Sequence, residues 1–379
     1  MTDVRAAVMH GPGKVRIERF PMPEPGPGSV IMKMHVSGIC GTDKHTYRGE
    51  TAQYAGTEHQ RTISYPLICG HENVGEVVAT GGDVRDFEGR LLHPGDRIVP
   101  GANVSCGVCP PCMANLPYYL CEHLEDYGNS LNCSEPPYLF GGWAEYLYLL
   151  PRTPIFRVPE NLPDRLAVLT EVMAVTHGVE SALAVLGDLG LPRFGNSVAV
   201  LGVGPLGMCH LIKASLLGAA LIVATDRFPT RLELAREFGA DVVFDVERTN
   251  EEERAGRVRE QTNGLGLDMV FDCTGVPASF VEALGLVRPG GVVVEAGAFV
   301  DLGPVSINPN ADICTRNVSI LGIGGERATA YLPSMRLLAA NQDRFPFEKV
   351  VSHDFVLEDI DTALETSLRG EAMQVLVHP

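Results

Sequence analysis

The sequence predicts an α/β protein of two domains: a mostly-β domain, then a doubly wound parallel sheet flanked by helices. Three observations support this prediction. The chain has 379 residues, enough for roughly two or three domains of about 150 residues each. Short strand-like runs separated by Pro- and Gly-rich turns dominate residues 1–150, as is typical of an all-β unit. From residue 197 onwards, apolar strand-like runs alternate with helical runs, which is the pattern of a parallel sheet.

Composition and charge narrow the classes of function. Hydrophobic residues make up 45% of the chain and charged residues 20%, so enough apolar surface is present to exclude a disordered chain. Lys and Arg number 30 against 47 Asp and Glu, which gives a net charge of −17. Because such a chain repels phosphate backbones and anionic lipids, we expect no nucleic-acid and no membrane partner. The N-terminal residues lack the apolar core of a signal peptide, so we expect a cytoplasmic protein.

The elements of the first half follow from local pattern. Residues 29–36, 73–78 and 143–150 are strand-like runs bounded by turns such as 93–96. Residues 166–185 carry apolar side chains at helical spacing and predict a long helix.

The second half alternates between strand and helix periodicity. The predicted strands are 197–204, 221–226, 241–245, 268–275, 290–297 and 318–325, with helices at 205–219 and 231–240. After about residue 325 the chain reads as helix and then as a strand at 373–378. We expect that strand to return to the first domain.

A glycine turn follows the first of these strands. Gly202, Gly204 and Gly207 form a G-x-G-x-x-G pattern at the start of a helix. The glycines permit a tight turn, close backbone approach to a pyrophosphate and close packing of helix on strand, and the helix N-terminus attracts phosphate. The alternative is a turn-forming glycine cluster without a ligand. That alternative is disfavoured because a strand, a turn, a helix, a second strand and an acidic residue follow one another in this order.

Asp226 ends the next strand, 24 residues after Gly202. A carboxylate there accepts hydrogen bonds from the adenosine ribose and repels a 2′-phosphate, so we expect NAD rather than NADP. Arg227 and Arg231 leave NADP open, because either guanidinium could bind that phosphate. The predicted cofactor-binding residues are Gly202, Gly204, Pro205, Leu206, Gly207, Asp226, Arg231 and Thr274.

Four of the ten cysteines lie close together as C-x2-C-x2-C-x8-C. This spacing lets four thiolates complete a closed tetrahedral zinc site, whose role is structural because no position is left for substrate. The alternative is four unrelated free thiols. The predicted ligands are Cys106, Cys109, Cys112 and Cys121.

A second group of potential ligands lies beside the strands of the first domain. Cys40 follows one strand, and His71 and Glu72 precede another. A thiolate, an imidazole and a carboxylate can bind zinc and leave one position open, where the metal acts as a Lewis acid on a bound alcohol. Each residue alone proves little, since a single histidine before a strand is usually structural. The group gains weight because it accompanies a dinucleotide turn.

Together these motifs resemble the zinc-dependent medium-chain alcohol dehydrogenases, and the resemblance covers essentially the whole chain. The pattern Gly70-His71-Glu72-x2-Gly75-x5-Gly81-x2-Val84 matches the family's zinc signature at every fixed position. The segments 40–45 and 141–146, the four-cysteine segment and the glycine turn also occur in the family's order.

This resemblance implies the domain organisation and the assembly. We expect a GroES-like catalytic zinc domain formed by residues 1–174 and 325–379, and a Rossmann NAD-binding domain formed by residues 175–324. The resemblance also implies a homodimer or homotetramer.

For the catalytic zinc, the resemblance implies Cys40 and His71 as ligands and Glu72 as a near ligand that enters or leaves the coordination sphere. The third ligand is expected from the helix after the β domain, where Glu171 replaces the cysteine of the alcohol-dehydrogenase branch. A glutamate there is similar to the polyol and threonine dehydrogenase branch. Two departures from the family are Val172 in place of proline and eight rather than seven residues before the last cysteine of the cysteine segment. We expect two zinc ions per chain, one catalytic and one structural.

The resemblance also implies a proton path. Thr42 is expected to hydrogen-bond the substrate oxygen, and His45 to end the path near solvent by way of the cofactor ribose. The alternatives are an ordinary turn hydroxyl and a surface histidine. The predicted catalytic residues are Cys40, Thr42, His45, His71 and Glu72.

The substrate is the least determined feature. Residues 50–65 form a polar loop from which Tyr54, His59 and Arg61 could contact substrate, the alternative being a solvated surface loop. The carboxylate-rich zinc sphere favours a vicinal diol, sugar alcohol or cyclitol, whose second hydroxyl could reach the metal. A hydroxy amino acid such as threonine and a bulky cyclic secondary alcohol stay open. Two other classes, an NAD- and zinc-binding sensor and a zinc-free quinone reductase-like enzyme, are disfavoured by the intact proton path and zinc ligands.

Overall fold

The computed structural model describes residues 3–53, 61–370 and 372–379 and divides the chain into two compact units. Unit 1 comprises Met1–Glu171, Tyr331–Gln342 and Val351–Pro379, and unit 2 comprises Val172–Ala330 and Asp343–Val350. Each unit has its own cluster of buried apolar side chains.

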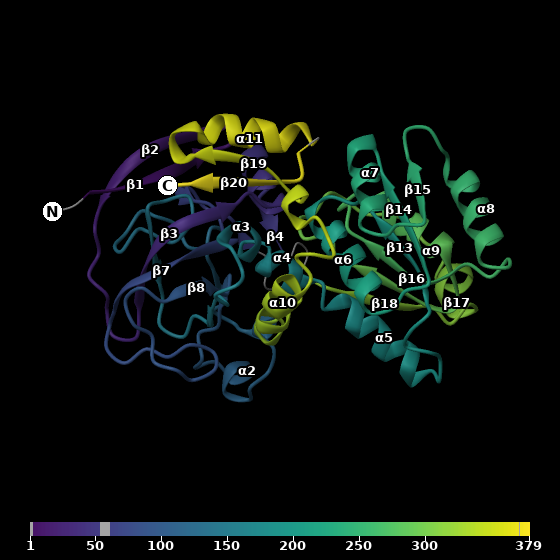
Figure 1. The fold of residues 1–379 in the computed structure, drawn as a ribbon, viewed down its shortest axis with the longest axis horizontal. Helices are drawn as coiled ribbons and strands as arrows, with labels where there is room; N and C mark the ends of the chain where they lie inside the picture. Colours follow the sequence, from purple (N-terminus) through teal and green to yellow (C-terminus); the bar gives the residue numbers. More distant parts are fainter. Residues whose placement is uncertain (1–2, 54–60, 371) are drawn as a thin grey trace. The chain divides into compact units, whose positions relative to one another are not determined.

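Unit 1 is built around a seven-stranded sheet in the order β12-β8-β7-β3-β20-β19, with β11 also paired to β3 (Figure 1). All its pairs are antiparallel except β19 with β20. The strands are β3 (Val30–Gly38), β7 (Asn73–Thr80), β8 (Arg97–Pro100), β11 (Tyr146–Leu149), β12 (Ile155–Arg157), β19 (Val351–Val356) and β20 (Gln374–His378). The last of these strands confirms the prediction that the chain forms a strand after residue 372.

Smaller sheets and short helices complete unit 1. The additional strands are β1 (Asp3–Gly11), β2 (Lys14–Pro21), β4 (Ala52–Gln53), β5 (Arg61–Thr62), β6 (Leu67–Ile68), β9 (Asn103–Val104) and β10 (Glu125–Asp126). The helices are α1 (Gly41–Arg48), α2 (Pro110–Met113), α3 (Asp164–Ala167), α4 (Thr170–Val175), whose last four residues belong to unit 2, α10 (Ala328–Ala340), which begins in unit 2, and α11 (Ile360–Arg369). Helix α11 lies against β19 and β20 (Figure 1).

Unit 2 holds a six-stranded parallel sheet in the order β15-β14-β13-β16-β17-β18. This order is that of a dinucleotide-binding Rossmann sheet and confirms the predicted fold class. The strands are β13 (Ser197–Leu201), β14 (Leu221–Asp226), β15 (Val242–Asp245), β16 (Leu267–Asp272), β17 (Val287–Glu295) and β18 (Ser319–Gly322). The helices are α5 (Gly178–Asp188), α6 (Pro205–Leu216), α7 (Pro229–Glu237), α8 (Glu251–Gln261) and α9 (Pro277–Leu286). Strands β13, β14 and β16 have almost wholly buried side chains, as expected for strands covered on both faces.

Two features differ from the sequence-based expectation. Residues 166–185, expected as one helix, are divided among α3, α4 and α5. The Thr176 hydroxyl donates to the Met173 carbonyl at 2.6 Å, and such side-chain bonds compete with the helical backbone. Taken as one, the helical stretch 164–188 has the length and composition of a membrane span, but 67% of its apolar window is buried, as in the core helices of folded domains.

The second difference concerns the edges of the units. The sequence placed all of residues 325–379 in the first domain, whereas residues 343–350 pack in unit 2. There Phe345 stacks on Phe238 with ring centroids 5.6 Å apart, and Phe347 lies 6.0 Å from the same ring. These aromatic contacts explain why the segment leaves unit 1 for eight residues.

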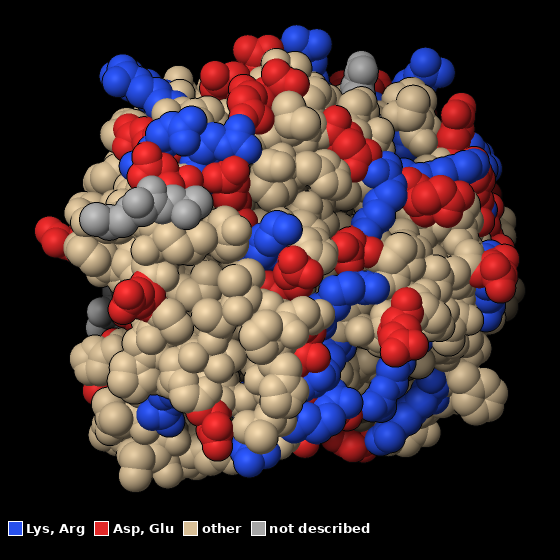
Figure 2. Space-filling view, turned by 60° about the vertical axis from the view of Figure 1, so that its left-hand side comes forward, with Lys and Arg blue, Asp and Glu red and all other residues tan. Residues whose placement is uncertain are grey.

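Acidic and basic side chains are interspersed on the face of the molecule shown in Figure 2. Several described pairs lie within salt-bridge distance, among them Arg157 with Asp86 and Asp96 in unit 1 and Arg254 with Glu282 in unit 2.

Candidate functional site

In unit 1, strand pairing brings Cys40, His71 and Glu72 together. Strand β3 ends two residues before Cys40, and β7 begins directly after Glu72. Because β3 and β7 are antiparallel, with Ser37 opposite Asn73, the end of one strand lies beside the start of the other. One potential ligand atom from each of the three residues lies within 4.8 Å of the others.

Asp43 joins the two segments that carry these side chains. It is the third residue of α1 and is fully buried. Its Oδ2 accepts a hydrogen bond from the Cys40 amide at 2.8 Å, and its Oδ1 accepts one from the Gly70 amide at 3.3 Å. Asp43 is absent from the site residues predicted from the sequence, although a carboxylate three residues after a helix N-cap is typical of a capping box.

The Glu72 carboxylate accepts a hydrogen bond from a strand that lies far away in the sequence. The side-chain amide of Gln374, on β20, donates to Glu72 Oε2 and lies 3.4 Å from the Ile39 carbonyl oxygen. Glu72 and Gln374 are each 1% exposed. A Cβ added at Gly38 would overlap both the Glu72 carboxylate and the Gln374 amide, so the glycine leaves room for this contact. Sequence reasoning missed Gln374 because no local pattern marks it.

Glu171 lies at the second position of α4 and is 6% exposed. It does not belong to the group of atoms within 4.8 Å, which contains Cys40, His71 and Glu72. Its charge nevertheless acts on the Cys40 thiol. The structure therefore places Glu171 beside the site rather than in the closest group.

The electrostatics of this group fit a divalent cation. Burial, with the carboxylates of Glu171 and Asp43 nearby, raises the pKa of the Cys40 thiol to about 11. Burial and the neighbouring Cys40 also raise the pKa of the Glu72 carboxyl well above its usual range, against the opposing effect of His71. A cation bound among them would reverse both shifts, because positive charge stabilises thiolate and carboxylate. The donor set of sulfur, nitrogen and oxygen is one that zinc accepts.

Thr42 and His45 lie on one side of α1, since residues three apart share a helix face. The hydroxyl and the backbone amide of Thr42 act to lower the pKa of the Cys40 thiol, against the larger effect of burial. His45 Nδ1 lies 2.6 Å from Glu50 Oε2, a partner that the sequence analysis did not identify. Of the expected substrate-contacting residues, Tyr54 and His59 lie outside the described residues.

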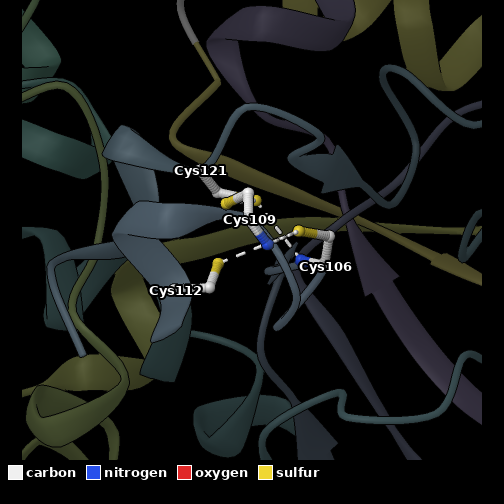
Figure 3. A group of neighbouring side chains, drawn as sticks. All are labelled: Cys106, Cys109, Cys112 and Cys121. Atoms are coloured by element: carbon white, nitrogen blue, oxygen red, sulfur yellow. Dashed lines mark hydrogen bonds between the residues drawn. The ribbon is translucent and has the colours of Figure 1, made fainter. Parts of the chain in front are cut away.

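The four cysteines of the C-x2-C-x2-C-x8-C segment form one group (Figure 3). Cys112 comes from α2, and the other three come from the turns around it. The Sγ atoms of Cys106 and Cys112 are 3.9 Å apart, and those of Cys109 and Cys121 are 4.0 Å apart. Four thiolates in a tetrahedron at about 2.3 Å from zinc have sulfurs about 3.8 Å apart, so the group fits a closed zinc site.

Backbone amides prepare one of these sulfurs for metal binding. The amides of Val108 and Cys109 donate to Cys106 Sγ at 3.5 and 3.4 Å. These hydrogen bonds lower the pKa of the Cys106 thiol to about 6. A thiolate is the form that binds zinc.

In unit 2, the glycine turn lies between β13 and α6 as predicted. Gly204 is the N-cap of α6, and Pro205 and Leu206 are its first residues. A Cβ at Gly207 would overlap the Gly202 carbonyl oxygen, so the glycine is needed for close helix–strand approach. The first amides of α6 are available to an anion, as at other helix N-termini.

Asp226 lies beside this turn. Its Oδ2 accepts from the Val203 amide at 3.0 Å, and its Oδ1 accepts from the Phe228 amide at 3.0 Å. Arg231 NH1 is 3.7 Å from Asp226 Oδ2 and 3.2 Å from the position of a Cβ at Gly204. The structure thus brings together the predicted acid, the predicted arginine and the turn.

Two acids missing from the sequence prediction shape the neighbouring loops. Asp272 and Glu295 end adjacent parallel strands and lie opposite each other in register. Asp272 Oδ1 accepts from the amide and hydroxyl of Thr274 at 3.0 and 2.7 Å. Glu295 Oε1 accepts from the amides of Gly297 and Ala298 at 3.0 and 2.9 Å. Because β13 pairs with β16 through Leu201 and Asp272, these loops adjoin the glycine turn.

Comparison with known proteins identifies the class. Residues 26–160 match the family model described as the alcohol dehydrogenase GroES-like domain, and residues 205–340 match the model described as zinc-binding dehydrogenase. The chain is 31% identical to sorbitol dehydrogenase of Ovis aries, across 98% of this chain and 95% of that protein. It therefore belongs to the zinc-dependent medium-chain alcohol dehydrogenase family. As a member, it is an oxidoreductase that acts on CH–OH donors.

Solved structures show the same fold. An alcohol dehydrogenase from Thermotoga maritima superposes with a TM-score of 0.89 at 28% identity, covering 100% of both chains. A zinc-binding dehydrogenase from Sinorhizobium meliloti, bound to NADP, superposes with a TM-score of 0.83 at 29% identity, again covering 100% of both chains.

The Glu72–Gln374 contact predicts different outcomes for two glycine-to-alanine substitutions. We expect Gly38→Ala to destabilise the protein by about 1–3 kcal/mol, because the methyl group overlaps buried side chains. The matched control is Gly41→Ala in α1, where an added Cβ meets no atom within 4 Å; it should leave stability unchanged or raise it slightly. Urea unfolding followed by circular dichroism measures both, and equal effects would contradict the packing described.

Glu295 predicts a pH dependence of stability. Burial, with Asp272 beside it, raises the pKa of Glu295 from 4.5 to about 7. The folded state therefore holds this proton more tightly than the unfolded state, so stability falls as pH rises between these two values. Glu295→Gln stays neutral and keeps an oxygen acceptor for the Gly297 and Ala298 amides.

Thermal unfolding of both proteins between about pH 5 and pH 8 tests this expectation. The Tm of the Glu295→Gln variant should rise relative to the unsubstituted protein as pH increases. A Tm difference that stays constant over this range would show that folding does not raise the pKa of the Glu295 carboxyl.

Proposed function

We propose that this protein oxidises a secondary alcohol of a diol, sugar alcohol or cyclitol to the ketone, using NAD and a catalytic zinc. The observation that carries the proposal is the group formed by half-buried Cys40 and buried His71 and Glu72, with Glu171 beside it, in a chain that also holds a dinucleotide turn. Either member of the alcohol–ketone pair can be the physiological substrate, since the same groups serve both directions.

The carboxylates support a hydroxylated substrate. Glu72 lies in the group with Cys40, and the charge of Glu171 acts on the Cys40 thiol. A cysteine in place of Glu171 would leave the site less polar. A second substrate hydroxyl can donate to a carboxylate or reach the metal. The 31% identity to a sorbitol dehydrogenase supports the same class. A threonine-like hydroxy amino acid and a bulky cyclic alcohol are the alternatives.

Each residue has a part in the proposed reaction. Cys40 and His71 would hold the zinc, with Glu171 as the third ligand that the family resemblance implies and Glu72 as the near ligand. The bound metal supplies Lewis acidity that lowers the pKa of the alcohol, and the nicotinamide supplies a hydride acceptor. Thr42 orients the substrate oxygen through its hydroxyl and passes on the proton, which His45 receives.

The four-cysteine group supports a second, structural zinc, so we propose two zinc ions per chain. Asp226 supports NAD over NADP, because its carboxylate repels a 2′-phosphate. The guanidinium of Arg231 lies 3.7 Å from the Asp226 carboxylate and supplies a positive charge, which would favour the 2′-phosphate of NADP instead. Following the family resemblance, we propose a homodimer or homotetramer.

Metal analysis and a substrate panel test the function. We expect two zinc ions per chain and NADH formation at 340 nm with diols, sorbitol and cyclitols, above the rates with threonine or cyclic monoalcohols. Cys40→Ala should lose one zinc and roughly 10³-fold or more in turnover, while NAD binding persists. The control is Cys314→Ala, which removes an exposed cysteine outside both metal groups. A zinc content below one per chain would refute the proposal.

Cofactor choice is tested at Asp226. We expect Asp226→Ala to weaken NAD binding about tenfold, since a hydrogen bond to a charged group is lost, and to reduce the discrimination against NADP. Asp245→Asn changes the carboxylate that ends the neighbouring strand β15 and should leave the NAD to NADP ratio unchanged. Titration of each variant with NADH and NADPH measures both constants. An unaltered ratio in Asp226→Ala would show that another residue selects the cofactor.

A further inference from the structure

We propose that Glu50 is a positioning residue for His45, and that it determines which ring nitrogen of His45 receives the proton. This inference rests on the proposed function, because it requires His45 to lie at the end of the proton path. It adds to that path a residue to which the sequence motifs assign no role.

The contact itself is close and directional. His45 Nδ1 lies 2.6 Å from Glu50 Oε2, and the side chains are 24% and 39% exposed. An ionised carboxylate only accepts hydrogen bonds, so the proton of a neutral imidazole must reside on Nδ1. Nε2 then keeps its lone pair and is the nitrogen that can take a proton.

The chain builds this contact through the end of α1. Gly49 adopts the left-handed conformation with φ +84°, and its amide donates to carbonyls of the last turn. The Glu50 amide follows by donating to the His45 carbonyl at 2.9 Å. The backbone is thereby folded back over the helix, and the Glu50 side chain returns to His45. The Tyr65 hydroxyl binds the Thr46 carbonyl at 2.7 Å and further fixes this turn.

Other ionisable groups near this part of α1 are directed elsewhere. Asp43 accepts hydrogen bonds from the Cys40 and Gly70 amides. Tyr47 experiences the charges of Asp361 and Glu365 on α11. Lys44 and Arg48 flank His45 in sequence and are cationic. Glu50 therefore supplies the negative charge in contact with His45 in the described part of unit 1.

Two consequences follow for the proposed reaction. Before proton transfer, Glu50 keeps His45 in the form whose Nε2 can accept. After transfer, the carboxylate stabilises the imidazolium, and the partly exposed ring can release the proton to water. Glu50 itself does not touch the reacting atoms.

The pH dependence of kcat/KM for the zinc-loaded enzyme with NAD and sorbitol, or the best substrate of the panel, tests the proposal. Glu50→Gln should lower kcat/KM about three- to tenfold near pH 7. It should also move the acidic limb to lower pH, because the imidazolium then lacks the carboxylate that lies 2.6 Å from its Nδ1. Glu50→Asp should restore part of the rate. Zinc content and NADH binding should remain unchanged in both variants.

A matched control exists in the same unit. His10 Nε2 and Glu18 Oε1 also lie 2.6 Å apart, on β1 and β2. Glu18→Gln removes the charge from that pair and should leave the pH profile unchanged. The same shift in both variants would overturn the proposal, because it would report a general loss of negative charge.

A second measurement separates this inference from the proposed function. In ¹⁵N-histidine spectra, the signal that disappears in His45→Gln should show a proton on Nδ1, and Glu50→Gln should abolish that preference. In the rate measurements, Glu50→Gln should add no further loss to His45→Gln. A proton on Nε2 in the unsubstituted protein, or full additivity, overturns the role of Glu50 alone. If His45→Gln changes neither rate nor pH profile, the proposed proton path fails, and the positioning role fails with it.

Discussion

The candidate site of unit 1 is governed by one electrostatic constraint. Several acidic side chains are shielded from water at the same place, so their charged forms are unfavourable. Cys40, Glu72 and Asp43 are packed together with Glu171 nearby, and burial raises the pKa of each of the first three. Charge repulsion is strong where water cannot screen it, so these groups cannot all ionise unless a cation compensates. Metal uptake at this site is therefore coupled to proton release, as expected for ligands that must be deprotonated to bind.

The arrangement of the strands turns this crowded group into a defined site. Strands β3, β7 and β20 lie side by side, and the segments at their ends supply Cys40, His71, Glu72 and Gln374. The Asp43 carboxylate links the segment of Cys40 to that of Gly70 by accepting hydrogen bonds from both backbone amides. The positions of these two donors are set by the backbone and not by a side-chain rotamer. Ligands placed at the end of a sheet are held more precisely than ligands on a long loop. In unit 2, carboxylates at strand ends fix the loops beside the glycine turn in the same way.

Sequence and structure differ most where contacts are distant along the chain. The four-cysteine group and the glycine turn could be predicted because their members lie within a few residues of one another. The open metal group could be proposed from its chemistry, but only the pairing of β3 with β7 explains why its members meet. Gln374 could not be found, since it lies 302 residues from Glu72 and depends on where β20 joins the sheet. The prediction of a single helix at 166–185 was wrong. Apolar periodicity contains no information about the hydrogen bond that the Thr176 hydroxyl donates to a backbone carbonyl.

The position of β20 has a consequence for how the protein forms during synthesis. This strand is an interior strand of its sheet, between β3 and the edge strand β19, yet it follows nearly all of unit 2 in the chain. Domains fold as their segments leave the ribosome, so residues 172–330 emerge before unit 1 can close its sheet. Until then, Glu72 lacks its amide partner, and the end of β3 at Ser37 and Gly38, which pairs with β20, is open to non-specific pairing. Nascent chains stalled before residue 374 should therefore be the form of this protein that most needs a chaperone.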